Sequence, residues 1–322
     1  MDDPHGATTH KERFISTITS SPLRTSALSR KQPSKSSTAK LPNWLKCMPF
    51  IGLHLACLAV LFTGVDVTAV VLCAVFYFAR MFGITGGYHR YFAHRSYKTS
   101  RVMQFLIACL GCSALQKGPL WWASHHRQHH RFSDTPDDPH SPHVTSFWWA
   151  HLGWILSEEY IETPWEVIRD WSIYPELRWL NRLHWLPGVF LAGLCWSIGY
   201  LTGGMAGAWS SLVCGFVIST VFVYHATFSI NSLSHLLGRR RYATDDDSRN
   251  NLFLALLTMG EGWHNNHHHY QSSANQGFFW WEIDLSYYII RTMSWLGLVW
   301  DIRKPGAKAL TYRNVEITPP RS

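Results

Sequence analysis

The sequence lacks the features of a disulfide-stabilised protein and of a nucleic-acid-binding protein. Its seven cysteines are an odd number and fall mostly within apolar stretches, which argues against a disulfide framework. The net charge of +8 comes from Lys and Arg residues scattered along polar segments, without a basic helix or a recognisable nucleic-acid module. We therefore expect no nucleic acid as a partner, and we interpret the cysteines as small buried hydrophobic residues.

Charged residues are also scarce, at 16 % of the chain, whereas 47 % of the residues are hydrophobic. The mean hydropathy of −0.08 is too polar for a pure bundle of membrane spans and unusually apolar for a soluble domain. The 17 tryptophans are typical of a protein whose amphipathic side chains lie at the level of lipid headgroups. The composition therefore predicts a protein divided between lipid and water.

Residues 1–40 lack apolar clusters and are rich in Ser, Thr, Lys and Arg. Such a segment cannot bury enough surface to offset its ordering entropy, so we predict a disordered tail. The segment also lacks the short apolar core of a secretory signal. We expect one membrane domain over residues 41–305 and a C-terminal tail over residues 306–322.

Four apolar segments are long enough to cross a bilayer, which takes about 20 residues. They cover residues 47–64, 67–87, 185–203 and 205–228, so each pair is joined almost directly and forms a tight hairpin. Of the 29 Lys and Arg residues, only Arg80 lies within these segments, where we expect it to extend to the interface. Neither connection contains Lys or Arg, so the positive-inside rule places both termini and both large polar segments in the cytosol.

The expected fold is therefore an all-α integral membrane protein. Four transmembrane helices form two tight hairpins, and a cytosolic helical cap is built from the polar segments between and after them. Three further apolar runs, over residues 102–115, 251–260 and 285–300, are too short to span a bilayer and are expected to lie buried or at the membrane surface.

Histidine is unusually frequent, with 19 residues, and nine of them fall in short clusters. These nine are His89, His94, His126, His129, His130, His235, His264, His267 and His268. The pattern HxxHH occurs twice, where chance predicts about 0.07 occurrences. Residues three and four apart share a helix face, so we expect each HxxHH box to converge. Residues five apart do not share a face of a continuous α-helix, so we expect His89 at a helix end and His94 just beyond it.

All nine histidines lie in segments expected on the cytosolic side, and nine imidazoles suit two metal ions better than one. Structural zinc prefers closed four-ligand sites that usually include thiolate, and no Cys accompanies these clusters. Imidazole suits iron, copper, nickel and zinc alike, so the residues alone leave the metal open. A membrane metal transporter or sensor is an alternative of another class, but transporters place their ligands near the bilayer midplane.

The order, spacing and membrane placement of these clusters resemble the integral-membrane fatty acyl desaturases, most closely the acyl-CoA branch of stearoyl-CoA, delta-9 type. The resemblance covers about residues 45–305. The supporting strings are GITGGYH at 83–89, RFSDT at 131–135, DPH at 138–140, GEGWH at 260–264, and the NxxxH element from Asn231 to His235.

The resemblance implies an enzyme that uses O₂ to insert a cis double bond, at carbon 9 in this branch, into a saturated long-chain acyl thioester such as acyl-CoA. It implies two iron ions held by the nine histidines, a water on one iron held by Asn231, and no further catalytic residue or cofactor. An unactivated methylene has no acidic proton, so acid–base side chains cannot attack it, and proteins delegate such chemistry to a metal. Since too few residues follow residue 305 for a fused haem domain, we expect a separate electron donor of ferredoxin or cytochrome type.

Three points stay open within the resemblance. Glu158 and Glu159 occupy the place where animal acyl-CoA members have an Arg-Lys pair, and carboxylates would repel a CoA phosphate, so acyl-carrier protein or intact lipid remain alternative carriers. We expect Tyr77 and Met81 to floor the acyl tunnel, with Met81 limiting its depth and Trp122 beside the site, although ordinary packing is the alternative. A related di-iron fatty acyl or sphingolipid hydroxylase is the nearest rival function.

Overall fold

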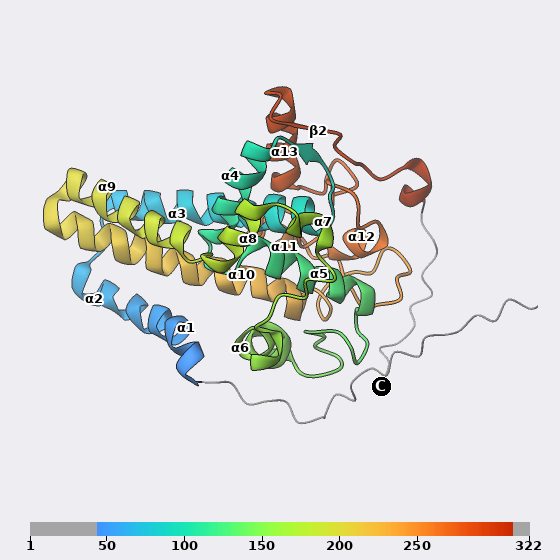
Figure 1. Cartoon of the computed structure of the whole chain (residues 1–322), viewed down its shortest axis with the longest axis horizontal. Coiled ribbons are helices and arrows are strands. Elements are labelled where there is room, and N and C mark those ends of the chain that lie inside the picture. Colours follow the sequence, from blue (N-terminus) through green and yellow to red (C-terminus); the bar gives the residue numbers. More distant parts are fainter. Residues whose placement is uncertain (1–43, 312–322) are drawn as a thin grey trace, which may run out of the picture. The chain divides into compact units, whose positions relative to one another are not determined.

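The computed structural model describes residues 44–311, which are mostly helical (Figure 1). The tail expected over residues 1–40, and most of that expected over 306–322, lie outside the described residues. Two short strands, β1 (Lys98–Thr99) and β2 (Val299–Trp300), pair antiparallel. The helices are α1 (Trp44–Ala56), η1 (Cys57–Ala59), α2 (Val60–Thr63), α3 (Val67–Phe82), η2 (Gly83–Ala93), α4 (Arg101–Cys112), α5 (Pro119–Phe132), η3 (Trp149–Gly153), α6 (Trp154–Leu156), η4 (Glu158–Tyr160), α7 (Arg169–Ser172), α8 (Pro175–Arg182), α9 (Leu186–Ser210), η5 (Ser211–Ile218), α10 (Ser219–Leu233), α11 (Leu252–Leu257), α12 (His264–His269), α13 (Leu285–Trp295) and η6 (Ala307–Leu310).

Within residues 44–311, two helical stretches are long and apolar enough to cross a membrane: Val67–Ala93, with 27 residues, and Leu186–Leu233, with 48 residues. The longer stretch is interrupted, because Gly203 has φ −144° and Gly204 has φ 61°. A positive φ suits glycine, which has no Cβ to clash with the backbone. The chain turns back at this point, so that η5 and α10 return alongside α9 (Figure 1). These apolar helices indicate membrane association, and Cys47–Thr63 is a third, shorter apolar helix.

Arg80 does not extend to the interface as the sequence predicted, because its side chain is completely buried between helices. Its guanidinium donates to Thr220 Oγ1 (2.5 Å), to Ser219 Oγ and to the carbonyl oxygen of Phe76 (3.0 Å). A buried charged group is tolerated only when its hydrogen-bonding capacity is used. Arg80 therefore links α3 to the start of α10.

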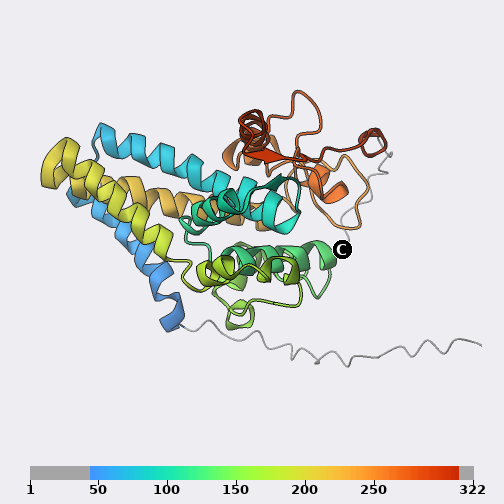
Figure 2. The same ribbon diagram turned by 45° about the horizontal axis from the view of Figure 1, so that its top comes forward.

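The remaining described elements form what we call the cap, residues 94–184 and 234–311. Figures 1 and 2 show the cap elements α5, α12 and α13 at the end of the long helices opposite the turn at Gly203 and Gly204. A buried core of residues from η2, α4, α5, α8 and α13 joins the cap to the long helices. This core holds η2 and α5 in place. These two helices carry four of the clustered histidines, and a fifth, His94, directly follows η2.

The apolar run expected over residues 102–115 is α4, which crosses η2 at very short distance. A Cβ added at Gly83 would lie 2.8 Å from the backbone nitrogen of Gly111, and one added at Gly111 would lie 2.2 Å from the ring of Tyr88. Both positions therefore require glycine for this close packing. The crossing fixes the position of η2, and with it the position of His89.

Candidate metal centre

The nine clustered histidines come together from four separate parts of the chain. His89 lies in η2 and His94 follows it; α5 carries three, one follows α10, and α12 carries three. Their ring nitrogens gather into two groups, and within each group the nitrogens lie within 4.8 Å of one another. We call them the five-histidine group (His89, His94, His126, His130 and His267) and the four-histidine group (His129, His235, His264 and His268).

An unusual backbone conformation brings His89 and His94 to one group. Gly83–Ala93 is a π-helix, and the backbone N–H of His94 donates to the carbonyl oxygen of His89 (3.1 Å), five residues before it. A π-helix has hydrogen bonds from i to i+5, so residues five apart lie nearly above each other. His94 does lie just beyond the helix, as the sequence predicted, but His89 lies inside the π-helix rather than at a helix end. The expectation failed because it assumed α-helical periodicity.

The two HxxHH boxes are each divided between the two groups. In α5, His126 and His130 join the five-histidine group and His129 joins the other. In α12 the division is the same, because His264 and His268 stay together and His267 crosses to the five-histidine group. Successive residues of an α-helix are about 100° apart, so residues four apart point nearly the same way while the residue between them points elsewhere. Convergence of the boxes is therefore confirmed only for the pairs four residues apart.

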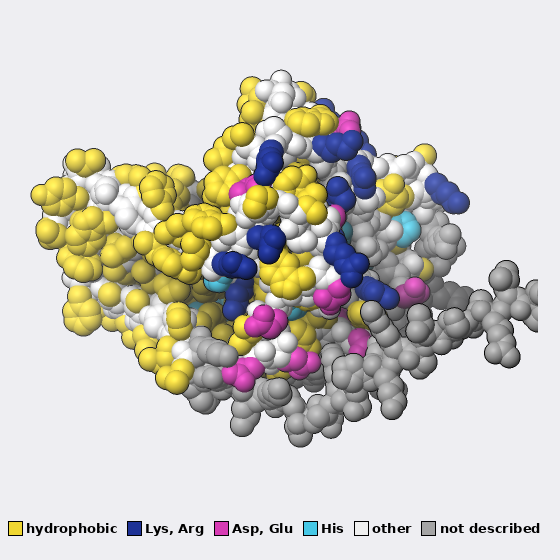
Figure 3. Space-filling view, in the orientation of Figure 1, with side chains coloured by type: hydrophobic (Ala, Val, Ile, Leu, Met, Phe, Trp, Pro, Cys, Tyr) yellow, Lys and Arg dark blue, Asp and Glu magenta, His cyan; other side chains and the backbone are white. Residues whose placement is uncertain are grey.

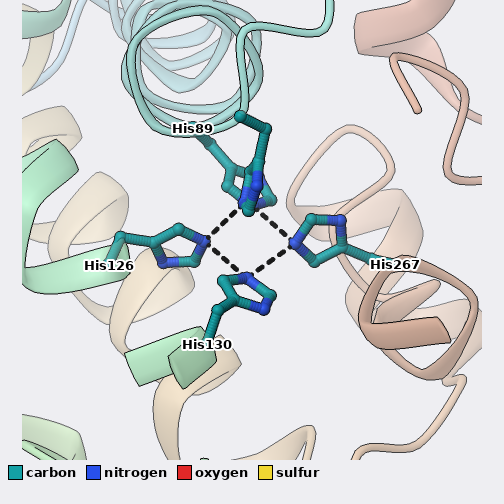
Figure 4. A group of neighbouring side chains, drawn as sticks. His89, His126, His130 and His267 are labelled. Atoms are coloured by element: carbon teal, nitrogen blue, oxygen red, sulfur yellow. Dashed lines mark hydrogen bonds between the residues drawn. The ribbon is translucent and has the colours of Figure 1, made fainter. Parts of the chain in front are cut away.

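The nitrogens of the five-histidine group have the spacing of ligands around one ion. The Nε2 atoms of His89 and His267, of His267 and His130, and of His130 and His126 are 2.9 Å apart, and those of His126 and His94 are 3.0 Å apart. Two nitrogens at right angles around a metal at about 2.1 Å would be about 3.0 Å apart. Figure 4 shows four of these rings pointing at a common centre. The donor set and its spacing fit a metal ion.

The four-histidine group converges in a similar way. The Nε2 atoms of His235 and His264 are 3.1 Å apart, and Nε2 of His268 is buried with no hydrogen-bond partner among the described residues. Asn231 lies four residues before His235 on α10 and, together with His264, lines a small cavity beside the group. Buried imidazole nitrogens without partners are costly, which is the state expected of ligands whose partner is a metal.

Four carboxylates, which the sequence analysis did not assign to the site, orient the histidines from behind. Nδ1 of His235 donates to Asp134 (2.8 Å), Nδ1 of His129 donates to Asp138 (3.0 Å), Nδ1 of His268 donates to Asp246 (2.5 Å), and Nδ1 of His89 contacts Glu261. Such partners fix the tautomer, so that Nε2 keeps its lone pair for a metal. The signal was present for Asp134, Asp138 and Glu261, which lie in the family-like strings, whereas nothing in the sequence singled out Asp246.

The electrostatics of the site keep three members of the five-histidine group available as ligands. Burial, and then the neighbouring imidazoles, lower the pKa of His126, His130 and His267 well below the ordinary value. These side chains are therefore neutral at neutral pH, the form that binds a metal. Burial works to raise the pKa of Asp138, but the interaction with His129 outweighs it and holds that pKa below its usual range. The carboxylate therefore stays ionised.

Replacing Asp138 by asparagine is expected to lower metal affinity by about 10–100-fold, the usual effect of losing a carboxylate behind a metal-bound imidazole. The amide keeps the size of the side chain but loses the charge that orients His129. Chelator competition on the purified protein, with Fe²⁺ as the probe, measures the change. Asp137→Asn is the matched control, because Asp137 is the exposed neighbour. Equal affinities for the two variants would contradict the assignment.

Two cavities reach the histidines. The large cavity has a volume of about 760 Å³ and a mostly apolar lining, and the small cavity has about 30 Å³. Trp122, His126 and Asn231 line both. The ring of Trp122 stacks on that of His126 with centroids 4.9 Å apart. The two cavities therefore meet beside the metal centre.

Of the three residues expected in the acyl tunnel, two line a cavity and one does not. Met81 and Trp122 line the small cavity, together with Ile84, Thr258 and Glu261. Tyr77 instead packs against the buried core and donates its hydroxyl to the carbonyl oxygen of Leu257 (2.7 Å). The structure thus brings Met81 and Trp122 next to the histidines and places Tyr77 in contact with α11.

Comparison with known proteins identifies similar chains. A family model described as fatty acid desaturase matches residues 66–294. The acyl-CoA 5-desaturase AL21 of Anemone leveillei is 38 % identical over 267 residues, which cover 79 % of this chain and 77 % of the relative. The sn-1 stearoyl-lipid 9-desaturase of Anabaena variabilis is 35 % identical over 271 residues, which cover 83 % and 96 %. The delta-9 desaturase-like 5 protein of Arabidopsis thaliana is 38 % identical over 268 residues, which cover 81 % and 85 %.

Proposed function

The chain belongs to the fatty acid desaturase family, and on that premise we propose that it is an O₂-dependent, di-iron desaturase. In this proposal it inserts a cis double bond, at carbon 9, into a saturated long-chain acyl group and thereby makes unsaturated fatty acids. The observation that carries the proposal is the convergence of nine histidines into two adjacent groups beside an apolar cavity.

The five-histidine group would hold one iron and the four-histidine group the other, with Asn231 binding through a water. When bound, the two irons would supply the oxidising chemistry. Overall, one hydrogen would be removed from each of two adjacent methylenes, and O₂, with two external electrons and two protons, would be reduced to two molecules of water. Asp134, Asp138, Asp246 and Glu261 would hold the Nδ1 proton of their histidines, which directs Nε2 to the metal.

The large cavity would position the acyl chain and exclude water. Its lining is mostly apolar and reaches His126 and Asn231 from the side of α1 and α9. Trp121 holds one wall in place, because its Nε1 donates to the carbonyl oxygen of Tyr160 (2.7 Å). An apolar site that excludes water protects a reactive oxidant from side reactions. Met81, which lines the small cavity beyond His89, would limit the length of chain that fits.

We further propose four membrane spans in two hairpins, with both termini and the metal centre on the cytosolic side. The turn at Gly203 and Gly204 supports the second hairpin. The short break between α2 and α3, where Gly64 has φ 63°, supports the first. The Lys and Arg distribution supports the orientation. The electrons would come from a separate donor of ferredoxin or cytochrome type.

The fatty-acid profile of a desaturase-deficient host tests the proposal. Expression of the full chain should yield a new monounsaturated acid, and derivatisation before gas chromatography locates its double bond. The product should disappear with His126→Ala, because one imidazole of the five-histidine group is lost. A hydroxy acid in its place would identify the rival hydroxylase, and no product from an iron-loaded chain supplied with electrons would refute the proposal. An unchanged chain-length distribution for Met81→Ala would show that Met81 does not limit the chain.

A further inference from the structure

The large cavity opens between two apolar helices. One wall is α1, with Cys47, Pro49 and Phe50, and the facing wall is the start of α9, with Val189 and the preceding Trp185. Residues that line a cavity and are also exposed mark its mouth. Pro49 on α1 is exposed, and Trp185, just before α9, and Val189 on α9 have exposed fractions of 48 % and 57 %. The mouth therefore lies between α1 and α9.

The surface around this mouth is apolar. Leu45 and Met48 on α1, and Leu186 and Phe190 on α9, are all exposed. Figure 3 shows hydrophobic side chains covering the region of α9, α3 and the α1–α2 segment. A continuous apolar surface of this kind is the side of a membrane protein that contacts acyl chains of lipid. A lipid chain can thus enter the cavity sideways, without leaving the bilayer.

The cap segment beside the cavity is acidic, although the described lining of the cavity itself contains no Asp or Glu. Ile155, Leu156 and Ile161 line the cavity, and the segment around them, residues 155–168, contains four glutamates and no Lys or Arg. Figure 3 shows acidic side chains gathered over the region of α6. Lys117 is the basic residue of the lining, and its Nζ lies 5.8 Å from the ring centroid of Trp121. The rim, residues 158–162, therefore contains three glutamates and no Lys or Arg.

This charge bears on the carrier of the acyl chain. The phosphates of coenzyme A carry about four negative charges at neutral pH, and the acidic side chains of the segment beside the cavity repel them. A lipid headgroup without net negative charge meets no such repulsion and lies at the level of the cap when its chain is in the bilayer. Resting on the proposed desaturase function, we propose that the substrate is an acyl chain of a membrane lipid with a neutral or zwitterionic headgroup, which enters between α1 and α9. In this proposal, a membrane lipid would take the place of the acyl thioester that the resemblance implied.

The purified full-length chain, iron-loaded and reconstituted in vesicles, provides the test. Labelled stearoyl chains are offered as 1-stearoyl phosphatidylcholine in the vesicle, as stearoyl phosphatidylglycerol, and as stearoyl-CoA, with ferredoxin and cytochrome b5 donor systems supplied in parallel. The phosphatidylcholine chain should be desaturated at least about tenfold faster than the CoA ester, and the anionic phosphatidylglycerol should fall between them.

Each other outcome has a definite meaning. Desaturation of stearoyl-CoA with unchanged phosphatidylcholine would overturn the lipid proposal and leave the desaturase function standing. No product from any of the three substrates would overturn the desaturase function itself, and with it the lipid proposal.

A charge-reversed variant tests the role of the rim. Glu159→Lys should raise the ratio of the stearoyl-CoA rate to the phosphatidylcholine rate about tenfold at low salt, and added salt should reduce this effect. Asp301→Lys is the matched control, because it makes the same change of charge at an exposed residue of another region, where Asp301 pairs with Lys98. Equal ratios for the two variants would show that the rim does not select the carrier.

Discussion

Replacing His267 by alanine is expected to remove one of the two proposed irons and all double-bond product. Nε2 of His267 lies 2.9 Å from Nε2 of both His89 and His130, so this side chain occupies a central place in the five-histidine group. Metal sites of this kind depend on a complete ligand set, because each missing imidazole leaves a position that the buried surroundings do not refill. We expect the iron content to fall from about two to about one per chain, and activity to fall by more than the roughly 100-fold typical of outer partners.

The helix α12 offers its own controls. His264→Ala should also remove about one iron per chain, this time from the four-histidine group. His269→Ala should leave both irons in place, because His269 stacks on Tyr242 and donates to the carbonyl oxygen of Ala309 instead. Iron is measured by inductively coupled plasma spectrometry on purified protein, and product by gas chromatography. Loss of both irons in every variant would argue for a single shared site or for unfolding, and no loss in His267→Ala would exclude it as a ligand.

Replacing Arg90 by methionine is expected to cause a large loss in the free energy of unfolding. The side chain is completely buried, and its guanidinium donates to Asp284 Oδ1 (2.8 Å), to Glu261 Oε1 (3.0 Å) and to the carbonyl oxygen of Ala274 (2.7 Å). Without Arg90, two buried carboxylates lose their counter-charge, which costs about 3–5 kcal/mol. Glu261 also contacts His89, so the metal centre loses part of its support.

Thermal unfolding in detergent measures this loss, with an expected fall of the midpoint of about 10 °C. Arg101→Met is the matched control, since Arg101 forms a similarly short pair with Glu176 (2.7 Å) but its side chain is 62 % exposed. An exposed pair contributes about 0–1 kcal/mol, so this midpoint should barely change. Equal shifts for the two variants would show that the buried network of Arg90 is not a main source of stability.

Much of the fold could be predicted from local sequence patterns. Long apolar runs bounded by glycine predicted the helices α3 and α9–α10 and the turn at Gly203 and Gly204, because helix length and hydrophobicity are properties of a contiguous segment. Arg80 was placed wrongly, because its partners Ser219 and Thr220 lie about 140 residues away in the chain. The resemblance predicted the family, which the comparisons confirm.

By itself, the sequence determined which side chains are available for the metal centre and which of them share a helix face. Histidines four residues apart in α5 and α12 stay together in the structure, because α-helical periodicity is local. Only the tertiary structure decided how the boxes divide: His129 and His267 cross to the other group because of how α5 and α12 pack against each other and against η2. The π-helix that brings His89 to His94 and the carboxylate that Asp246 brings to His268 were likewise decided by packing. Packing contacts join residues distant in the chain, and the π-helix departs from α-helical periodicity, so neither composition nor periodicity records these features.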